Sequence, residues 1–366
     1  MTMQRYLAVG MAAFSLAAGS ASQAFAQTAP ALERASPQER ARLAPVIEAA
    51  KQEGSVSYWD AVIQPHTKDA LTAAFLKRYG LPATFRVNHT LAGTATVITR
   101  VEQEIKAGQV RIDVVGSAGT AWVYGLLRAG HILPYDSPEL VHYPRMVEAG
   151  VAEPGYFGVN GSYLLVPMWS EEHLKFAGRS WKDVLGAVPN GRISVGDSSK
   201  SATYLATHIG LSSVLEADFF RKLAAMKPSF LVRSEQIAGR LVTGEDLMSF
   251  SGMPTRAFQY NQKGAKLKFL LPEEGVVLLA QAMFILKAAP HPNAAKLWVD
   301  FLLSEEGQRI LAGSEALVSG RSGFASPLPD YAPNIDAMKV IKIDWKGMSD
   351  SELKKARDGW IAVFGN

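Results

Sequence analysis

The sequence has 366 residues, a formal net charge of +4 and no cysteine. The lack of cysteine excludes thiol catalysis, cysteine-ligated zinc and iron–sulfur clusters. Lysine and arginine form no long block, which argues against a nucleic-acid partner. A chain of this length suggests two domains, and it can bury a large core without disulfides.

The N-terminus has the pattern of an export signal. Arg5 supplies a positive charge, residues 6–18 are apolar, and residues 24–26 form an A-x-A cleavage site. A membrane anchor is the alternative, but the apolar run is shorter than the roughly 20 residues that span a bilayer. We therefore predict a signal peptide over residues 1–26 and a soluble mature protein that begins at Gln27.

The first half of the mature chain repeats the order strand, turn and helix three times. The predicted strands are residues 55–59, 83–87 and 112–115, and the predicted helices are residues 40–54, 67–79, 95–107 and 121–129. This alternation predicts a parallel sheet with helices on its faces.

A nearly continuous apolar run over residues 161–169 predicts a strand that leads into a second α/β unit. That unit has predicted strands at residues 192–195 and 247–251, predicted helices at residues 181–185, 215–226 and 234–243, and a further helix that starts at Lys200. Residues 265–271 then return toward the first unit, and the tail ends in a predicted helix over residues 349–360.

Residues 271–313 link the second unit to the last part of the chain. A turn at residues 273–275 precedes an apolar strand over residues 276–286, and a proline-bracketed turn precedes a helix for which Asn293 is a suitable N-cap. The apolar positions Ala294, Leu297, Trp298, Phe301 and Leu302 repeat at helical spacing.

This stretch resembles family 1 solute-binding proteins of ABC importers, in the branch that includes ferric-ion-binding proteins. The shared elements are P-x-x-G, an apolar strand, and H-P-x-A-A-x-x-x-x-x-F-L-x-S-x-E-G-Q, which run from Pro272 to Gln308. The resemblance implies an α/β, two-lobed type II periplasmic-binding fold, with a mostly parallel sheet flanked by helices in each lobe. It places one lobe in residues 27–165 and 276–366, the other in residues 166–275, and a ligand cleft between them.

The resemblance also implies a function. A periplasmic protein of this kind captures a small solute by hinge closure and delivers it to a membrane permease that works with a cytoplasmic ATPase. It needs no cofactor or catalytic residue, and we expect it to act as a monomer.

The strongest predicted binding segment is residues 196–204, which follows a strand and opens a helix. Free backbone N–H groups and the positive end of the helix would meet an anion there, beside Ser199, Ser201, Ala202 and Thr203. The segment resembles the D-P-x-x-S-G-T anion-binding turn of the family, with Ser198 in place of proline and Ala202 in place of glycine. Ordinary N-capping by a serine-rich turn is the alternative.

Further candidates lie at the ends of other predicted strands. They are Trp59, Asp60, Thr94, Ser117, Gly119 and Thr120 in the first lobe. Each could equally be a helix cap or a core residue. In the second lobe, Arg256 would bind an organic anion through bidentate bonds or pair at the surface. Glu274 would attract an amine in the cleft or lie as a solvated surface charge.

The sequence argues against a bound metal and against catalysis. Ferric-binding relatives carry adjacent tyrosines about ten residues after a Gly-Glu pair, but residues 253–255 stand at that place here. No G-x-S-x-G motif occurs, and the seven histidines show no H-x-x-x-H spacing. A ferric or iron-chelate carrier and a secreted hydrolase remain the alternatives. The solute itself stays open among organic acids, phosphonates, sugar phosphates, amino-bearing anions and chelated iron.

Overall fold

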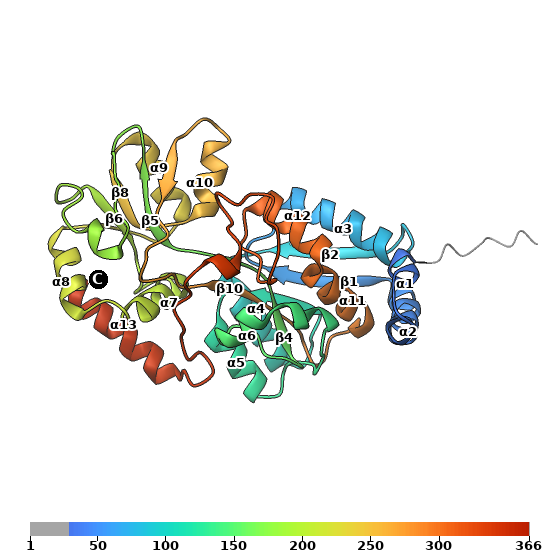
Figure 1. The fold of residues 1–366 in the computed structure, drawn as a ribbon. Coiled ribbons are helices and arrows are strands. Elements are labelled where there is room, and N and C mark those ends of the chain that lie inside the picture. The colour runs from blue at the N-terminus through green and yellow to red at the C-terminus, as the bar shows by residue number, and fades with distance from the viewer. Residues whose placement is uncertain (1–28, 366) are drawn as a thin grey trace, which may run out of the picture.

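The computed structural model describes residues 29–365, and it confirms the α/β class. Two five-stranded sheets, each flanked by helices, form two lobes that lie side by side (Figure 1). The predicted signal peptide lies outside the described residues. None of the helices in residues 29–365 is long and apolar enough to cross a membrane.

The sheet of the first lobe has the order β2-β1-β3-β10-β4. Its strands are β1 (Ser55–Asp60), β2 (Arg86–Leu91), β3 (Val114–Ser117), β4 (Phe157–Tyr163) and β10 (Leu279–Ile285). Strand β1 is parallel to β2 and β3, whereas β10 is antiparallel to β3 and β4. Only β10 therefore runs against the other strands of this sheet.

The helices around this sheet come from both ends of the chain. They are α1 (Pro30–Glu33), α2 (Pro37–Glu53), α3 (Pro65–Tyr79), α4 (Thr94–Ala107), α5 (Thr120–Arg128), η1 (Pro138–His142), α6 (Pro144–Glu148), α11 (Pro292–Leu303) and α12 (Glu305–Glu315). Trp298 of α11 is fully buried, and its ring meets the Phe75 ring of α3 edge-on at 5.0 Å. The N- and C-terminal parts of the chain thus share one core.

The sheet of the second lobe has the order β7-β6-β8-β5-β9. Its strands are β5 (Val166–Ser170), β6 (Ile193–Gly196), β7 (Ser229–Leu231), β8 (Met248–Gly252) and β9 (Leu267–Phe269), and only β5 runs against the others. The surrounding helices are η2 (Trp181–Val184), α7 (Ala202–Leu211), α8 (Ala217–Ala225), α9 (Ser234–Thr243) and α10 (Pro254–Asn261).

Two segments connect these sheets. The chain passes from β4 to β5 through Leu164 and Leu165, and it returns from β9 to β10. The single strand predicted over residues 161–169 is therefore two strands. They cannot be continuous, because β4 pairs with β10 in one sheet while β5 pairs with β8 and β9 in the other.

Two other local predictions were wrong. The second strand spans β2 (Arg86–Leu91) rather than residues 83–87, because the Phe85 N–H bonds to the Pro82 carbonyl in a turn. The N-cap of α11 is His291 rather than Asn293. Pro292 occupies the first helical turn, and the Asn293 N–H donates to the carboxylate of Glu53 at 3.1 Å.

The tail after α12 contacts both lobes before it ends. It includes η3 (Ile335–Ala337), and its last element is α13 (Asp350–Phe364). Helix α13 packs on α7 and α8 of the second lobe, at the lower left of the molecule in Figure 1. The lobe boundaries at residues 165 and 275 remain a proposal. The resemblance places residues 276–366 in the first lobe, but α13, the last helix of this segment, packs on the second lobe.

Candidate functional site

A cavity of about 260 Å³ lies between the two lobes. From the first lobe it is lined by Ala61, Val62, Gln64, Gly93, Thr94, Glu315 and Leu317, and from the crossing strand by Tyr163. From the second lobe it is lined by Ser201, Thr203, Tyr204, Val232, Arg233, Ser234, Glu235, Met253, Thr255, Arg256 and Gln259. A solute held there would contact both lobes at once.

Five helices point their N-termini at this cavity. Their N-cap residues, Gln64, Gly93, Ser201, Arg233 and Met253, all line it and belong to α3, α4, α7, α9 and α10. Ser201 is the one N-cap of these five whose side chain accepts a capping bond. Uncapped helix N-termini present free N–H groups and partial positive charge, and such ends bind anions.

Arg233 and Arg256 both line the cavity, but they differ in their partners. The Arg256 guanidinium donates to Glu235 at 2.5 Å, to Gln259 at 2.6 Å and to Ser234 at 3.0 Å, so it is engaged within its own lobe. Arg233 is exposed, and its guanidinium makes no hydrogen bond or ion pair with residues 29–365. Arg233 is therefore the cation in this lining that can bind a solute without giving up a partner.

The first lobe contributes a carboxylate. Glu315 is buried, and its Oε1 accepts from the Gln64 N–H at 2.8 Å and from the Thr67 hydroxyl at 2.5 Å. These bonds tie the end of α12 to the N-cap residue and first turn of α3. The second lobe thus offers the free cation Arg233 and three helix N-termini, and its Glu235 carboxylate is held by Arg256. The first lobe offers the Glu315 carboxylate and the N-termini of α3 and α4.

Two tyrosines complete the lining where the chain crosses between lobes. Tyr163 ends β4, and Tyr204 lies in the first turn of α7. A Cβ on Gly196 would lie 2.1 Å from the Tyr204 ring, so glycine is required for the ring to sit there. Burial raises the pKa of both tyrosines, which keeps the phenols protonated as neutral hydrogen-bonding groups.

Of the twelve residues predicted from sequence, four line the cavity. They are Thr94, Ser201, Thr203 and Arg256. Two others support the lining from behind. Asp60 accepts the N–H groups of Val62 and Ile63, at 2.6 and 2.8 Å, and so holds the loop after β1. Ser199 donates its hydroxyl to Asp197 at 2.5 Å, in the turn before α7.

The other six predicted residues lie outside the lining, and they are Trp59, Ser117, Gly119, Thr120, Ala202 and Glu274. Trp59 packs under the Arg100 guanidinium, and the Ser117 hydroxyl accepts from the Gly119 N–H. The Glu274 carboxylate accepts from the Ser180 hydroxyl and the Trp181 N–H at the start of η2. Its charge is therefore used to cap a helix.

Sequence reasoning missed Arg233, Glu315 and Tyr163. Arg233 follows the short strand β7 and begins α9, the same strand-to-helix geometry that identified Ser201. The predicted elements include no strand at β7, because a run of three residues is too short to indicate one. Glu315 ends α12, and nothing near it in sequence indicates that it meets α3.

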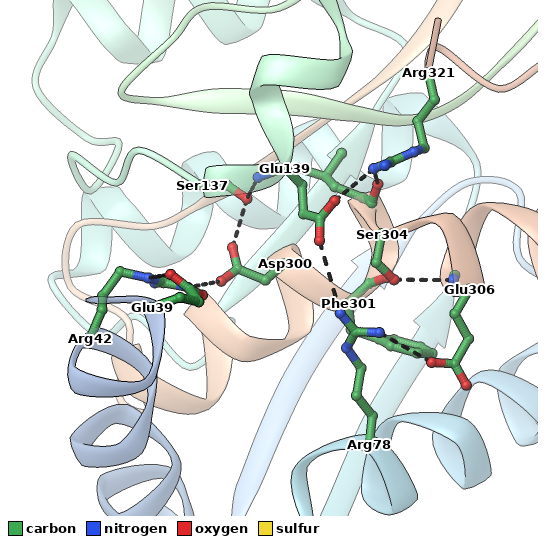
Figure 2. A network of polar contacts seen from close by, with 12 residues as sticks. Glu39, Arg42, Arg78, Ser137, Glu139, Asp300, Phe301, Ser304, Glu306 and Arg321 are labelled. Atoms are coloured by element: carbon green, nitrogen blue, oxygen red, sulfur yellow. Dashed lines mark hydrogen bonds and ion pairs between the residues drawn. The ribbon is translucent and has the colours of Figure 1, made fainter. Parts of the chain in front are cut away.

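A second hollow, of about 390 Å³, lies on the first lobe away from the cleft. Figure 2 shows that its charged groups pair with one another. The guanidinium of Arg42 contacts both Glu39 and Asp300, at 2.6 and 3.0 Å, and that of Arg78 contacts Glu306 at 3.3 Å. These pairs join α2 to α11 and α3 to α12 within one lobe, so we assign them a structural role.

Two α/β lobes with a polar cavity between crossing strands define a two-lobed solute-binding protein. Residues 112–341 match the family described as bacterial extracellular solute-binding protein, and the chain belongs to this family. The family consists of transport components rather than enzymes.

Three similar proteins share 24% sequence identity or less with this chain. An uncharacterized protein of Haemophilus influenzae is 24% identical over 307 residues, which cover 80% of this chain and 86% of the relative. The periplasmic binding protein AfuA of Actinobacillus pleuropneumoniae, solved with fructose 6-phosphate, superposes with a TM-score of 0.68 at 20% identity, over 85% of this chain and 98% of AfuA. Iron-bound HitA of Pseudomonas aeruginosa superposes with a TM-score of 0.66 at 16% identity, over 84% of this chain and 99% of HitA. At these identities the two structures establish the shared fold alone.

Proposed function

We propose that this protein is the periplasmic solute-binding component of an ABC importer and that its solute is a small anionic or zwitterionic molecule. The family supports solute binding, and the predicted signal peptide supports export. Its partners would be a membrane permease and an ATPase, which receive the solute from the closed protein.

The observation that carries the anionic solute is the uncompensated Arg233 beside the N-termini of α7, α9 and α10. An anionic group would bind this side of the cavity through charge-assisted hydrogen bonds. Glu315 faces the same cavity from the first lobe, and it favours a hydroxyl or ammonium group on the remainder of the solute. A solute with both features would bridge the lobes.

Bridging provides the mechanism of capture. A ligand shifts a conformational equilibrium only as far as it binds one state better than the other. Here the anion-binding groups and Glu315 sit on different lobes, so a solute gains both sets of contacts only when the lobes are close together. The solute would therefore favour the closed form, which the permease would recognise.

Ferric iron is the second candidate, because Tyr163 and Tyr204 both line the cavity and iron-bound HitA shares the fold. Phenolate oxygens bind ferric iron, and phenols must lose their protons to do so. Burial raises the pKa of both tyrosines, which opposes that loss. We therefore rank an organic anion ahead of iron.

A thermal-melt screen tests this proposal. The mature protein, refolded to remove any carried ligand, is melted with carboxylates, phosphonates, sugar phosphates, amino acids and ferric citrate. A ligand at 100 times its Kd adds about 2.7 kcal/mol to the free energy of unfolding, which raises Tm by several degrees. We expect a metal-free anion to produce this shift. A shift with ferric citrate alone, absent with citrate, would overturn the anionic solute in favour of iron.

A further inference from the structure

Gln281 is a fully buried amide in β10, and neither its Nε2 nor its Oε1 has a hydrogen-bond partner in residues 29–365. An unsatisfied buried amide costs stability, because it has lost its bonds to water without replacing them. Gln281 also sits at a register shift, between Ala280, which pairs with Ser162, and Ala282, which pairs with Val159. Such irregularities re-aim side chains, and they are frequent beside functional sites.

The amide lies next to the solute cavity. Leu279 is paired with Tyr163, and Gln281, two residues further on, lies on the same face of the sheet. The Gln281 and Thr203 side chains both lie within reach of the Tyr163 hydroxyl, although Gln281 makes no hydrogen bond of standard geometry to it. Tyr163 and Thr203 line the cavity, whereas Gln281 lies behind them. Side chains from β4 (Tyr163), β10 (Gln281) and α7 (Thr203) therefore lie close together beside the cavity.

We propose that Tyr163 is a solute-contacting residue and that Gln281 is the positioning residue that orients its hydroxyl. This inference rests on the proposed function and names a residue, besides Glu315, that contacts the second polar group of the solute. The solute is an organic anion that carries a hydroxyl or ammonium group apart from its anionic group. The anionic group binds at Arg233, and the second group bonds to the Tyr163 oxygen.

This arrangement explains why an amide occupies a costly position. Gln281 can both donate to and accept from a phenol hydroxyl, so it can fix the direction of the Tyr163 O–H. A leucine of similar size would remove the unsatisfied amide but leave the hydroxyl free to rotate. Gln281 therefore lowers the stability of the fold but gives the Tyr163 hydroxyl a defined direction toward the solute.

Binding to three probes tests the inference by calorimetry. Fructose 6-phosphate carries hydroxyls, 2-aminoethylphosphonate carries an ammonium, and inorganic phosphate carries neither. In the wild type we expect one of the organic probes to bind more tightly than inorganic phosphate. Tyr163→Phe and Gln281→Leu should each weaken that organic probe about tenfold, or about 1.4 kcal/mol, while the affinity for inorganic phosphate changes less than twofold.

Stability separates this role from a structural one. Gln281→Leu should keep or raise Tm while it weakens binding. Ser162→Ala is the matched control, because its buried hydroxyl is also unpartnered among the described residues, yet its side chain lies on the opposite face of β4 from Tyr163. It should raise or keep Tm without changing affinity. Gln281→Met provides a second test of the amide if the leucine variant does not fold.

The outcomes test the Tyr163 contact separately from the proposed anionic solute. If the wild type binds none of the three probes, both the anionic solute and the Tyr163 contact are overturned. If an organic probe binds and both variants retain its affinity, or lose affinity for all three probes equally, only the contact is overturned. A lower Tm for Gln281→Leu and Gln281→Met would assign the amide a structural role.

Discussion

Arg233 and Arg256 show how a side chain's partners decide its role at the scale of the residue. Both line the cavity from the start of a helix in the second lobe. Arg233 is the N-cap of α9, and Arg256 lies in the first turn of α10. Sequence reasoning chose Arg256, whose guanidinium is held by Glu235, Gln259 and Ser234. Only the side chains around each guanidinium show that Arg233 is the one without a competing carboxylate.

Arg233→Ala should weaken binding of the anionic solute at least tenfold, or about 1.4 kcal/mol. The reason is the loss of a charge-assisted hydrogen bond to the anionic group of the solute. Its Tm without solute should stay near that of the wild type, because the Arg233 side chain has no partner in residues 29–365 to lose.

The measurement is calorimetric titration with the solute found in the melt screen. Arg221→Ala is the matched control, because it removes the same charge from α8, where Arg221 pairs with Asp218. Equal affinities of Arg233→Ala and the wild type would contradict the assigned role of Arg233.

At the scale of the element, aromatic packing holds the C-terminal helix α13 on the second lobe. Trp360 is buried, and its ring lies 5.1 Å from the ring of His208 in α7 and 4.0 Å from that of Phe364. The Phe220 ring of α8 lies on the same histidine at 4.8 Å. His208 is therefore enclosed by aromatic side chains from α8 and α13.

Burial lowers the pKa of His208 to about 4, from an ordinary value near 6.5. Between these two values the unfolded chain binds a proton that the folded chain does not. Stability is therefore lost as the pH falls from about 6.5 toward 4, by on the order of 3 kcal/mol in total. Urea unfolding at pH 7 and pH 4.5 measures this loss.

His208→Leu should reduce the difference in unfolding free energy between the two pH values, because the titrating group is gone. His66→Leu is the control, since His66 is exposed at the start of α3. A leucine variant at position 208 with the full wild-type pH dependence would show that other groups are responsible.

Three segments join the lobes at the scale of the whole molecule. Two are the crossings at β4–β5 and β9–β10, and the third is the tail (Figure 1). The tail binds the second lobe where the Asn261 amide donates to the Tyr331 hydroxyl at 3.0 Å. It binds the first lobe where Lys342 and Lys346 pair with Glu148 and Glu153, at 2.7 and 2.8 Å.

Saturation with the solute should make the protein more compact, because bound solute favours the state in which both lobes contact it. Small-angle X-ray scattering of the free and saturated protein measures the change in radius of gyration. The Arg233→Ala variant, at the solute concentration that saturates the wild type, should show a smaller change. An unchanged radius of gyration for the saturated wild type would contradict closure.

Much of the fold could be predicted from the sequence because it depends on local patterns. Short runs of β-forming and apolar residues predict most strands, and apolar residues at helical spacing predict most helices. The order strand, small residues and helix predicts the turn before α7. The division of residues 161–169 between two sheets could not be predicted this way. Its apolar residues are buried in both sheets, so their pattern is the same on either side of Leu164 and Leu165.

The sequence by itself determined the α/β class, the two-lobed resemblance and four residues of the cavity lining. Tertiary structure decided which helix N-termini meet, which arginine is free, and that Glu274 caps η2 while Glu315 reaches the cavity. The physical reason is the separation in sequence of the residues that interact. Helix and strand formation depends on neighbours a few residues apart, whereas the cavity brings together residues as distant as Val62 and Leu317, whose proximity depends on how the sheets are ordered.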